Sequence, residues 1–151
     1  MDAETTVREY YGALRDGDPL APFFLDAPSV VKFGLSERLS GHDEVAAGLR
    51  EQTRTTTDWT VGSSNLLAEA RGDAGWFSDD VFLAWTDVER GIRYEFDTRW
   101  SGTLVRVDEG PWNGDGRETG SENGEGPGRG RGDGSAWRFA GMHVSTVQEG
   151  I

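Results

Sequence analysis

A chain of 151 residues has the length of one domain, and it contains no cysteine, which excludes disulfides, thiolate chemistry and cysteine-based zinc sites. Its 27 acidic residues against 15 basic ones give a net charge of −12, which disfavours binding to nucleic acids and anionic membranes. Because no apolar run approaches the roughly 18 residues of a membrane span and the acidic first residues do not form a signal peptide, we expect a cytoplasmic protein.

Nearly all of the basic residues are arginines. Lys32 is the only lysine, and the other 14 basic residues are arginines. Acid-rich, lysine-poor surfaces are typical of salt-loving organisms, so we predict a halophilic protein whose melting temperature rises with KCl. The alternative is an acidic protein from a GC-rich genome.

The first predicted element is an amphipathic helix over residues 3–16. Its apolar residues follow the i, i+3, i+4, i+7 spacing of one helix face, and Asp16-Gly17 ends the pattern. This stripe consists of Val7, Tyr10, Tyr11 and Leu14. The helix is therefore expected to bury two tyrosines.

Three shorter elements follow. Asp18-Pro19 predicts a short helix by its N-cap and first-turn proline, and residues 29–35, SVVKFGL, form a β-rich run. Ser40 and Asp43 fit a capping box for a helix that extends to about Thr53. The N-terminal half is thus expected to hold about three helices and one strand.

The rest of the chain is predicted to be β-structure, with segments at 59–70, 74–86, 92–107 and 136–147. In the third segment, apolar Tyr94 and Phe96 alternate with charged residues, so one face is apolar. Residues 110–134 contain 10 glycines and only one large apolar residue, and we expect a disordered hairpin insertion there. Helices followed by antiparallel strands predict one α+β domain over residues 1–151, with helices packed on one face of a curved sheet.

Three local motifs strengthen this prediction. They are FGLSERLSGHDEV at 33–45, GDAGWF at 72–77 and AWRFAGMHVS at 136–145. In this order they resemble the SnoaL-like branch of the nuclear transport factor 2-like superfamily, which includes the ketosteroid isomerases. The resemblance implies a cone-like fold whose strongly curved, mainly antiparallel sheet and helices enclose one apolar pocket, commonly in a homodimer formed through the sheet. Because this fold hosts enzymes, binders and association domains, the function has to be argued from the pocket residues.

His143 is the first candidate site residue. Strict alternation from Phe139 places it on the same side of the closing strand as that residue, where it could act as a pocket acid or base. The alternative is a buried histidine that packs the sheet. Members of the family often carry a second histidine two residues earlier, and Gly141 at that position weakens any two-histidine or metal proposal.

Tyr10 and Tyr11 are the second candidates. In the related ketosteroid isomerases a tyrosine of the first helix donates a hydrogen bond to an oxyanion, so Tyr11 is a candidate catalytic residue and Tyr10 a candidate for binding. The alternative is that both only pack the core. The resemblance places Lys32 near the position of the isomerase base, and no carboxylate lies between Ser29 and Ser36. The isomerase mechanism therefore lacks its base.

Asp97 and Arg99 resemble the pair that epoxide hydrolases of this superfamily use to hold a water. Their i, i+2 spacing places them on one strand face, but that face also carries Arg93 and Glu95. A solvated or dimer-facing charge ladder is the favoured interpretation unless this face lines the pocket.

A pocket for a flat apolar ligand would use some of the many aromatic residues. The candidates for substrate binding are Tyr10, Phe33, Trp76, Trp85, Tyr94 and Trp100. We expect no cofactor and no metal, because the chain has two distant histidines and lacks a calcium-loop motif.

Three functions remain open. The first is a SnoaL-like binding protein for a small apolar ligand. The second is an isomerase, cyclase or dehydratase acting on an apolar cyclic substrate. The third is a non-catalytic homodimeric association domain. Because the usual base is missing, binding ranks ahead of catalysis.

Overall fold

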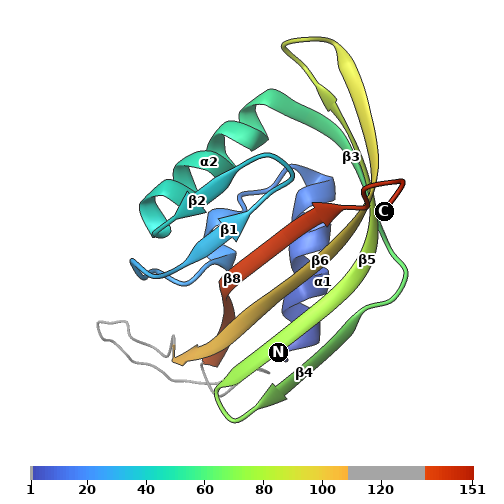
Figure 1. Ribbon diagram of the computed structural model, residues 1–151. Helices are drawn as coiled ribbons and strands as arrows, with labels where there is room; N and C mark the ends of the chain where they lie inside the picture. Colours follow the sequence, from blue (N-terminus) through green and yellow to red (C-terminus); the bar gives the residue numbers. More distant parts are fainter. Residues whose placement is uncertain (1, 109–134) are drawn as a thin grey trace.

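The computed structural model describes residues 2–108 and 135–151, so the predicted insertion at 110–134 lies outside the described residues. In chain order the elements are α1 (Ala3–Asp16), the 3-10 helix η1 (Ala21–Phe23), β1 (Val31–Phe33), β2 (Arg38–Ser40), α2 (His42–Thr55), β3 (Thr56–Ser63), β4 (Leu67–Arg71), β5 (Ala74–Asp87), β6 (Ile92–Asp108) and β8 (Ser135–Thr146). Both α-helices lie on one side of a curved sheet, in agreement with the predicted α+β class (Figure 1).

Helix α1 occupies the predicted residues. Asp2 caps its N-terminus by accepting a 2.8 Å hydrogen bond from the backbone N–H of Thr5. Gly17 ends it in the left-handed region at φ 74°, a conformation that costs glycine nothing. The predicted apolar stripe is the buried face of this helix.

The second predicted helix is reduced to the single 3-10 turn η1, so the described chain has two α-helices rather than about three. Phe24 leaves helical geometry for an extended conformation and forms an isolated parallel bridge with Phe139. The N–H of Leu25 then donates to the carbonyl of Phe139 at 2.9 Å. Pairing with the closing strand therefore ends the helix that Asp18-Pro19 would start.

Helix α2 begins at His42, but without the predicted capping box. Ser40 belongs to β2 and pairs with Val31, and Gly41 is the N-cap with φ 85° and no side-chain cap. The N–H of Ser40 instead donates to the Glu44 carboxylate at 2.8 Å. A strand that pairs with β1 thus replaces the turn that the capping box requires.

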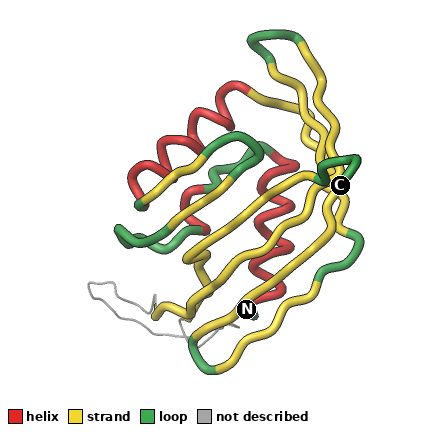
Figure 2. The backbone as a smooth tube through the Cα atoms, in the orientation of Figure 1, coloured by secondary structure: helices red, strands yellow, loops and turns green. Residues whose placement is uncertain are grey.

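The strands form one sheet in the order β2-β1-β8-β6-β5-β3, and β4 pairs with the other end of β5. Among the described strands, all pairings are antiparallel except that of β1 with β8, and the isolated Phe24–Phe139 bridge is also parallel. The predicted segment 59–70 divides into β3 and β4. Figure 2 shows α2 passing directly into β3, and the β5–β6 hairpin extends past the helices.

The sheet has an inner face, which packs on the helices, and an outer face. Buried residues alternate along β5, and their cross-strand partners on β6 include Phe96, Trp100 and Leu104. The apolar face predicted for 92–107 is therefore the inner one. Tyr10 lies at the centre of the core, with edge-to-face ring contacts to Phe23, Phe24, Trp100 and Phe139. Neither described α-helix is long and apolar enough to cross a membrane.

Candidate ligand-binding site

A cavity of about 320 Å³ lies between the helices and the inner face of the sheet. Its walls come from α1, α2, the β1–β2 turn and strands β1, β3, β5, β6 and β8. The lining residues are Tyr10, Leu14, Lys32, Gly34, Leu35, Ser36, Glu37, Gly48, Glu51, Gln52, Thr55, Thr56, Trp59, Leu83, Trp85, Trp100 and Val144. Its volume is in the range of sites that take small organic molecules.

One wall of the cavity is aromatic. Trp100 lies against Tyr10 at a ring-centroid distance of 6.1 Å and is fixed by a 2.9 Å hydrogen bond from its indole N–H to Thr98. Trp59 and Trp85 stack at 4.8 Å with an interplanar angle of 19°. These rigid rings present flat apolar surface, which suits a planar ligand.

The polar end of the cavity is formed by β1 and the β1–β2 turn. Lys32 extends from the inner side of β1, its side chain is only 7% exposed, and its Nζ donates to Glu37 Oε1 at 3.0 Å. Glu37 lies on the β1–β2 turn and its side chain is 40% exposed. A buried ammonium is stable only when it is paired, and Glu37 supplies the pairing charge.

The Tyr10 phenol lies in the same cavity. Burial raises the pKa of Tyr10 well above its usual value, and the negative charge of Glu37 raises this pKa further. The hydroxyl is therefore a neutral donor across the physiological range. Tyr10 is 2% exposed, and its hydroxyl makes no hydrogen bond with any residue in the described part of the chain.

Tyr11 faces a different part of the core. Its hydroxyl donates to Asp79 Oδ2 at 2.8 Å, and Asp79 also accepts from Ser63 Oγ at 2.6 Å and from the Asn65 N–H at 2.9 Å. Burial raises the pKa of Tyr11, and the bond to Asp79 adds to this effect. Asp79 is buried but does not line the cavity, and its three donors give it a structural role.

The predicted binding residues lie in three places. Tyr10, Trp85 and Trp100 line the cavity. Tyr94 is half-buried on the β5–β6 hairpin, next to Trp85 but outside the cavity lining. Phe33 and Trp76 lie on the outer face, where Trp76 is 48% exposed.

His143 does not lie on the same side of β8 as Phe139. Phe139 and Met142 are buried on the inner face, whereas His143 is exposed and contacts Phe33 at a ring-centroid distance of 5.3 Å. A β-bulge explains this difference, because Leu104 pairs with Phe139 and Thr103 with Gly141, which leaves Ala140 as an extra residue. The bulge reverses the alternation, so His143 lies outside the cavity.

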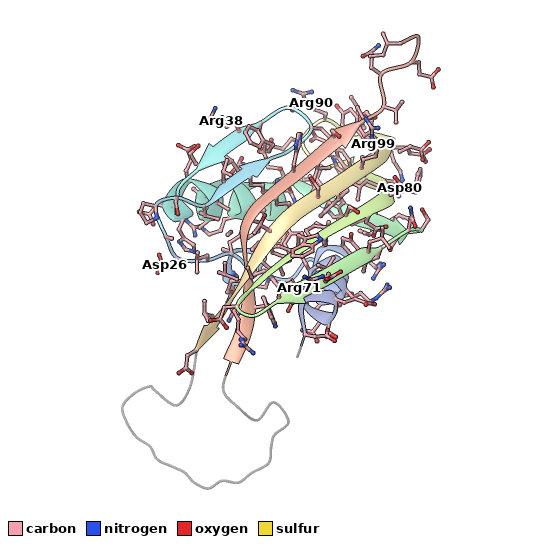
Figure 3. All side chains as sticks on the ribbon, turned by 60° about the horizontal axis from the view of Figure 1, so that its bottom comes forward. Asp26, Arg38, Arg71, Asp80, Arg90 and Arg99 are labelled. Atoms are coloured by element: carbon pink, nitrogen blue, oxygen red, sulfur yellow. The ribbon has the colours of Figure 1, made fainter. Side chains whose placement is uncertain are left out.

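The charged face of β6 is also the outer one. Arg99 is opposite Asp80 and Asp97 is opposite Phe82, and Figure 3 shows Asp80 and Arg99 away from the helices. The pair Asp97 and Arg99 therefore belongs to a charge ladder on the outer face. In residues 2–108 and 135–151 no group of three or more His, Asp or Glu residues is arranged to hold a metal ion.

Sequence reasoning missed Glu37 and Asp79. Residues 29–36 contain no carboxylate, and Glu37 is the next residue. Asp79 lies between Phe77 and Val81 on the inner face of β5. A charged residue in the middle of an apolar strand face indicates a buried polar network, so the sequence did carry a signal for Asp79.

The arrangement of helices, curved sheet and cavity is that of the nuclear transport factor 2-like fold. A superfamily member from Salmonella enterica serovar Typhimurium superposes with a TM-score of 0.68 at 15% identity, covering 97% of this chain and 90% of that one. A candidate dehydratase from Streptomyces avermitilis gives 0.68 at 16% identity, covering 96% and 93%. A candidate calcium/calmodulin-dependent protein kinase type II association domain from Thiobacillus denitrificans gives 0.59 at 16% identity, covering 97% and 95%.

The family follows from the sequence match. The model of the SnoaL-like domain matches residues 3–113, and the chain therefore belongs to the SnoaL-like family of this superfamily. No curated protein matches the chain.

Proposed function

We propose that the protein binds a small, flat, largely apolar molecule in the cavity between its helices and sheet. The observation that carries the proposal is the combination of a volume of about 320 Å³ with an aromatic wall and a polar end. Trp59, Trp85 and Trp100 would cover the faces and edges of a ring system. Lys32 and Tyr10 would orient its polar group.

An isomerase or dehydratase is the second candidate. Its support is that the cavity contains a carboxylate, Glu37, together with the Tyr10 hydroxyl. In such an enzyme Glu37 would transfer a proton and Tyr10 would donate to a developing oxyanion. Lys32 already binds the Glu37 carboxylate at 3.0 Å, so Glu37 would have to leave this ion pair before it could take a proton from a substrate. We therefore rank binding ahead of catalysis.

We also propose a homodimer formed through the outer face of the sheet. Trp76 and Phe82 are 48% and 39% exposed there, and both are large for solvent-exposed positions on a sheet. The ladder of Asp80, Arg99 and Asp97 on the same face supplies charges of both signs. A second copy of the chain could bury the two aromatic side chains and pair with the charges in one interface.

Isothermal titration with a panel of planar hydrophobic compounds, both neutral and acidic, tests the binding proposal. Leu35 lines the cavity and is half-buried, so Leu35→Trp should occupy the cavity and reduce affinity at least about tenfold, or about 1.4 kcal/mol. Leu67→Trp, at a position 64% exposed on β4, is the matched control and should bind as the wild type does. Equal affinities of the two variants would contradict the cavity as the binding site.

A further inference from the structure

We propose that the cavity selects ligands that carry a carboxylate, and that this group replaces Glu37 on the Lys32 ammonium. The inference rests on the proposed binding function and names its ligand class as planar aromatic acids. Three features of the polar end carry it: the unused donors of Lys32, the unpaired hydroxyl of Tyr10, and the loose attachment of Glu37.

Lys32 has more donors than partners. An ammonium carries three N–H groups, and in the described chain only Glu37 accepts from this one. The side chain is 7% exposed and lines the cavity, so bulk water cannot fully solvate the remaining donors. A buried ammonium gains most from an acceptor that is itself charged.

Tyr10 adds a further donor to the same cavity. Its hydroxyl is buried and without a hydrogen-bond partner among the described residues, although a buried phenol normally has one. A carboxylate has two oxygens, so it can accept from Lys32 and from Tyr10 at once.

Glu37 is placed so that it can leave. Among the described residues Lys32 is the only side chain that binds its carboxylate, and the side chain is 40% exposed, so the released group would be hydrated at once. Its backbone is fixed independently, because its carbonyl accepts from the N–H of Gly34 at 3.0 Å. Exchange of Glu37 for a ligand carboxylate therefore keeps Lys32 paired and the turn intact.

The Glu37 side chain also depends on a glycine. It folds over Gly34, where an added Cβ would lie 2.9 Å from its Cγ and its Oε1. Because Gly34 has no left-handed backbone, an alanine is conformationally acceptable there, and it would move the flexible Glu37 side chain away from Lys32. Gly34→Ala is thus a second way to release Glu37 without removing its charge.

The other charges of the protein oppose an anionic ligand only weakly. Glu51 lines the cavity, but Arg54 binds its carboxylate at 2.6 Å. The net charge of −12 is screened over about 8 Å at physiological ionic strength. Contact with Lys32 is direct and involves an ammonium that is only 7% exposed, so it outweighs these screened charges.

The test compares 2-naphthoic acid with its neutral isostere 2-naphthamide by isothermal titration. The measured quantity is the ratio of their affinities. We expect Glu37→Gln and Gly34→Ala to raise the acid-to-amide ratio by about tenfold, because each removes the competitor for Lys32. Lys32→Met should lower the ratio by at least a similar factor. Glu69→Gln, which alters a carboxylate of β4 that pairs with Arg71, is the control and should leave the ratio unchanged.

Lys32 offers a second readout, because the ammonium resonance of the only lysine can be assigned without ambiguity. It should shift on addition of the acid and not on addition of the amide. A ratio that falls or stays constant in Glu37→Gln, or amide binding without acid binding, would overturn the carboxylate assignment and leave the binding function intact. Failure of both probes to bind the wild type and Glu37→Gln would overturn both proposals.

Discussion

Tyr11 and Asp79, 68 residues apart in the sequence, are joined by a buried 2.8 Å hydrogen bond that links α1 to β5. Removal of the hydroxyl in Tyr11→Phe leaves Asp79 with two donors, Ser63 and Asn65. We expect a loss of about 1–3 kcal/mol in the free energy of unfolding, because a buried carboxylate loses a donor that water cannot replace.

Urea unfolding measures this loss. Tyr94→Phe is the matched control, since the Tyr94 hydroxyl only accepts a 3.5 Å exposed contact from Arg90, and its effect should be near zero. Equal effects of the two substitutions would show that the Tyr11 bond contributes no net stability.

Because Tyr10 and Tyr11 are buried, we expect the protein to lose stability at alkaline pH. Burial raises the pKa of both phenols above the ordinary value of about 10, so above that pH the unfolded chain loses protons that the folded chain keeps. The contribution of the two tyrosines to the free energy of unfolding is therefore fully present below about pH 10. As the pH rises further, the free energy of unfolding falls by up to about 1.4 kcal/mol per pH unit for each tyrosine.

Comparison of the wild type with Tyr10→Phe measures the contribution of Tyr10. Between about pH 10 and 11.5, the free energy of unfolding of the variant should fall less steeply with pH, by the amount that one tyrosine contributes. An unchanged slope would mean that Tyr10 titrates alike in the folded and unfolded states.

Gly102 is required by a close approach between β6 and β8. A Cβ at this position would lie 2.5 Å from the carbonyl oxygen of Gly141 and 2.7 Å from the Phe77 ring. Because the nearer atom is backbone, Gly102→Ala should destabilise the protein by about 1–3 kcal/mol.

Gly12 provides the opposite case. It lies within α1, and a Cβ there meets nothing within 4 Å, so Gly12→Ala should stabilise the protein by about 0.5–1 kcal/mol. Thermal or urea unfolding of both variants checks the prediction. Shifts of the same sign would contradict the packing described at one of the two sites.

The proposed dimer makes Trp76 an interface residue. Trp76→Glu would replace an exposed aromatic residue of the proposed interface with a charge, and sedimentation should then show a monomer where the wild type is a dimer. Val88→Glu, at an exposed position of the β5–β6 turn, should remain dimeric. A monomeric wild type, or a dimeric Trp76→Glu variant, would contradict association through the outer face.

The sequence predicted those parts of the fold that local periodicity determines. The stripe of α1 and the alternation of β6 correctly identified the buried faces. The short second helix failed because Phe24 bridges to Phe139, and the capping box failed because Ser40 pairs with Val31. In both cases strand pairing with a residue outside the local segment overrides the helical preference of that segment.

The candidate site was harder to predict than the fold. Tyr10, Trp85 and Trp100, predicted from the sequence as binding residues, line the cavity, and their role in binding stays a prediction. The position of His143 depended on the bulge at Ala140, where one extra residue reverses every side chain after it. Gly141, an isolated glycine in a strand, was the available signal of that bulge.

A crystal structure of the protein grown with 2-naphthoic acid would show where the ligand binds. We expect ring density between Tyr10 and the stacked pair Trp59 and Trp85, with the carboxylate on Lys32 and the Glu37 side chain turned out to solvent. An empty cavity at saturating concentration, or density only on the outer face near His143, would contradict this expectation.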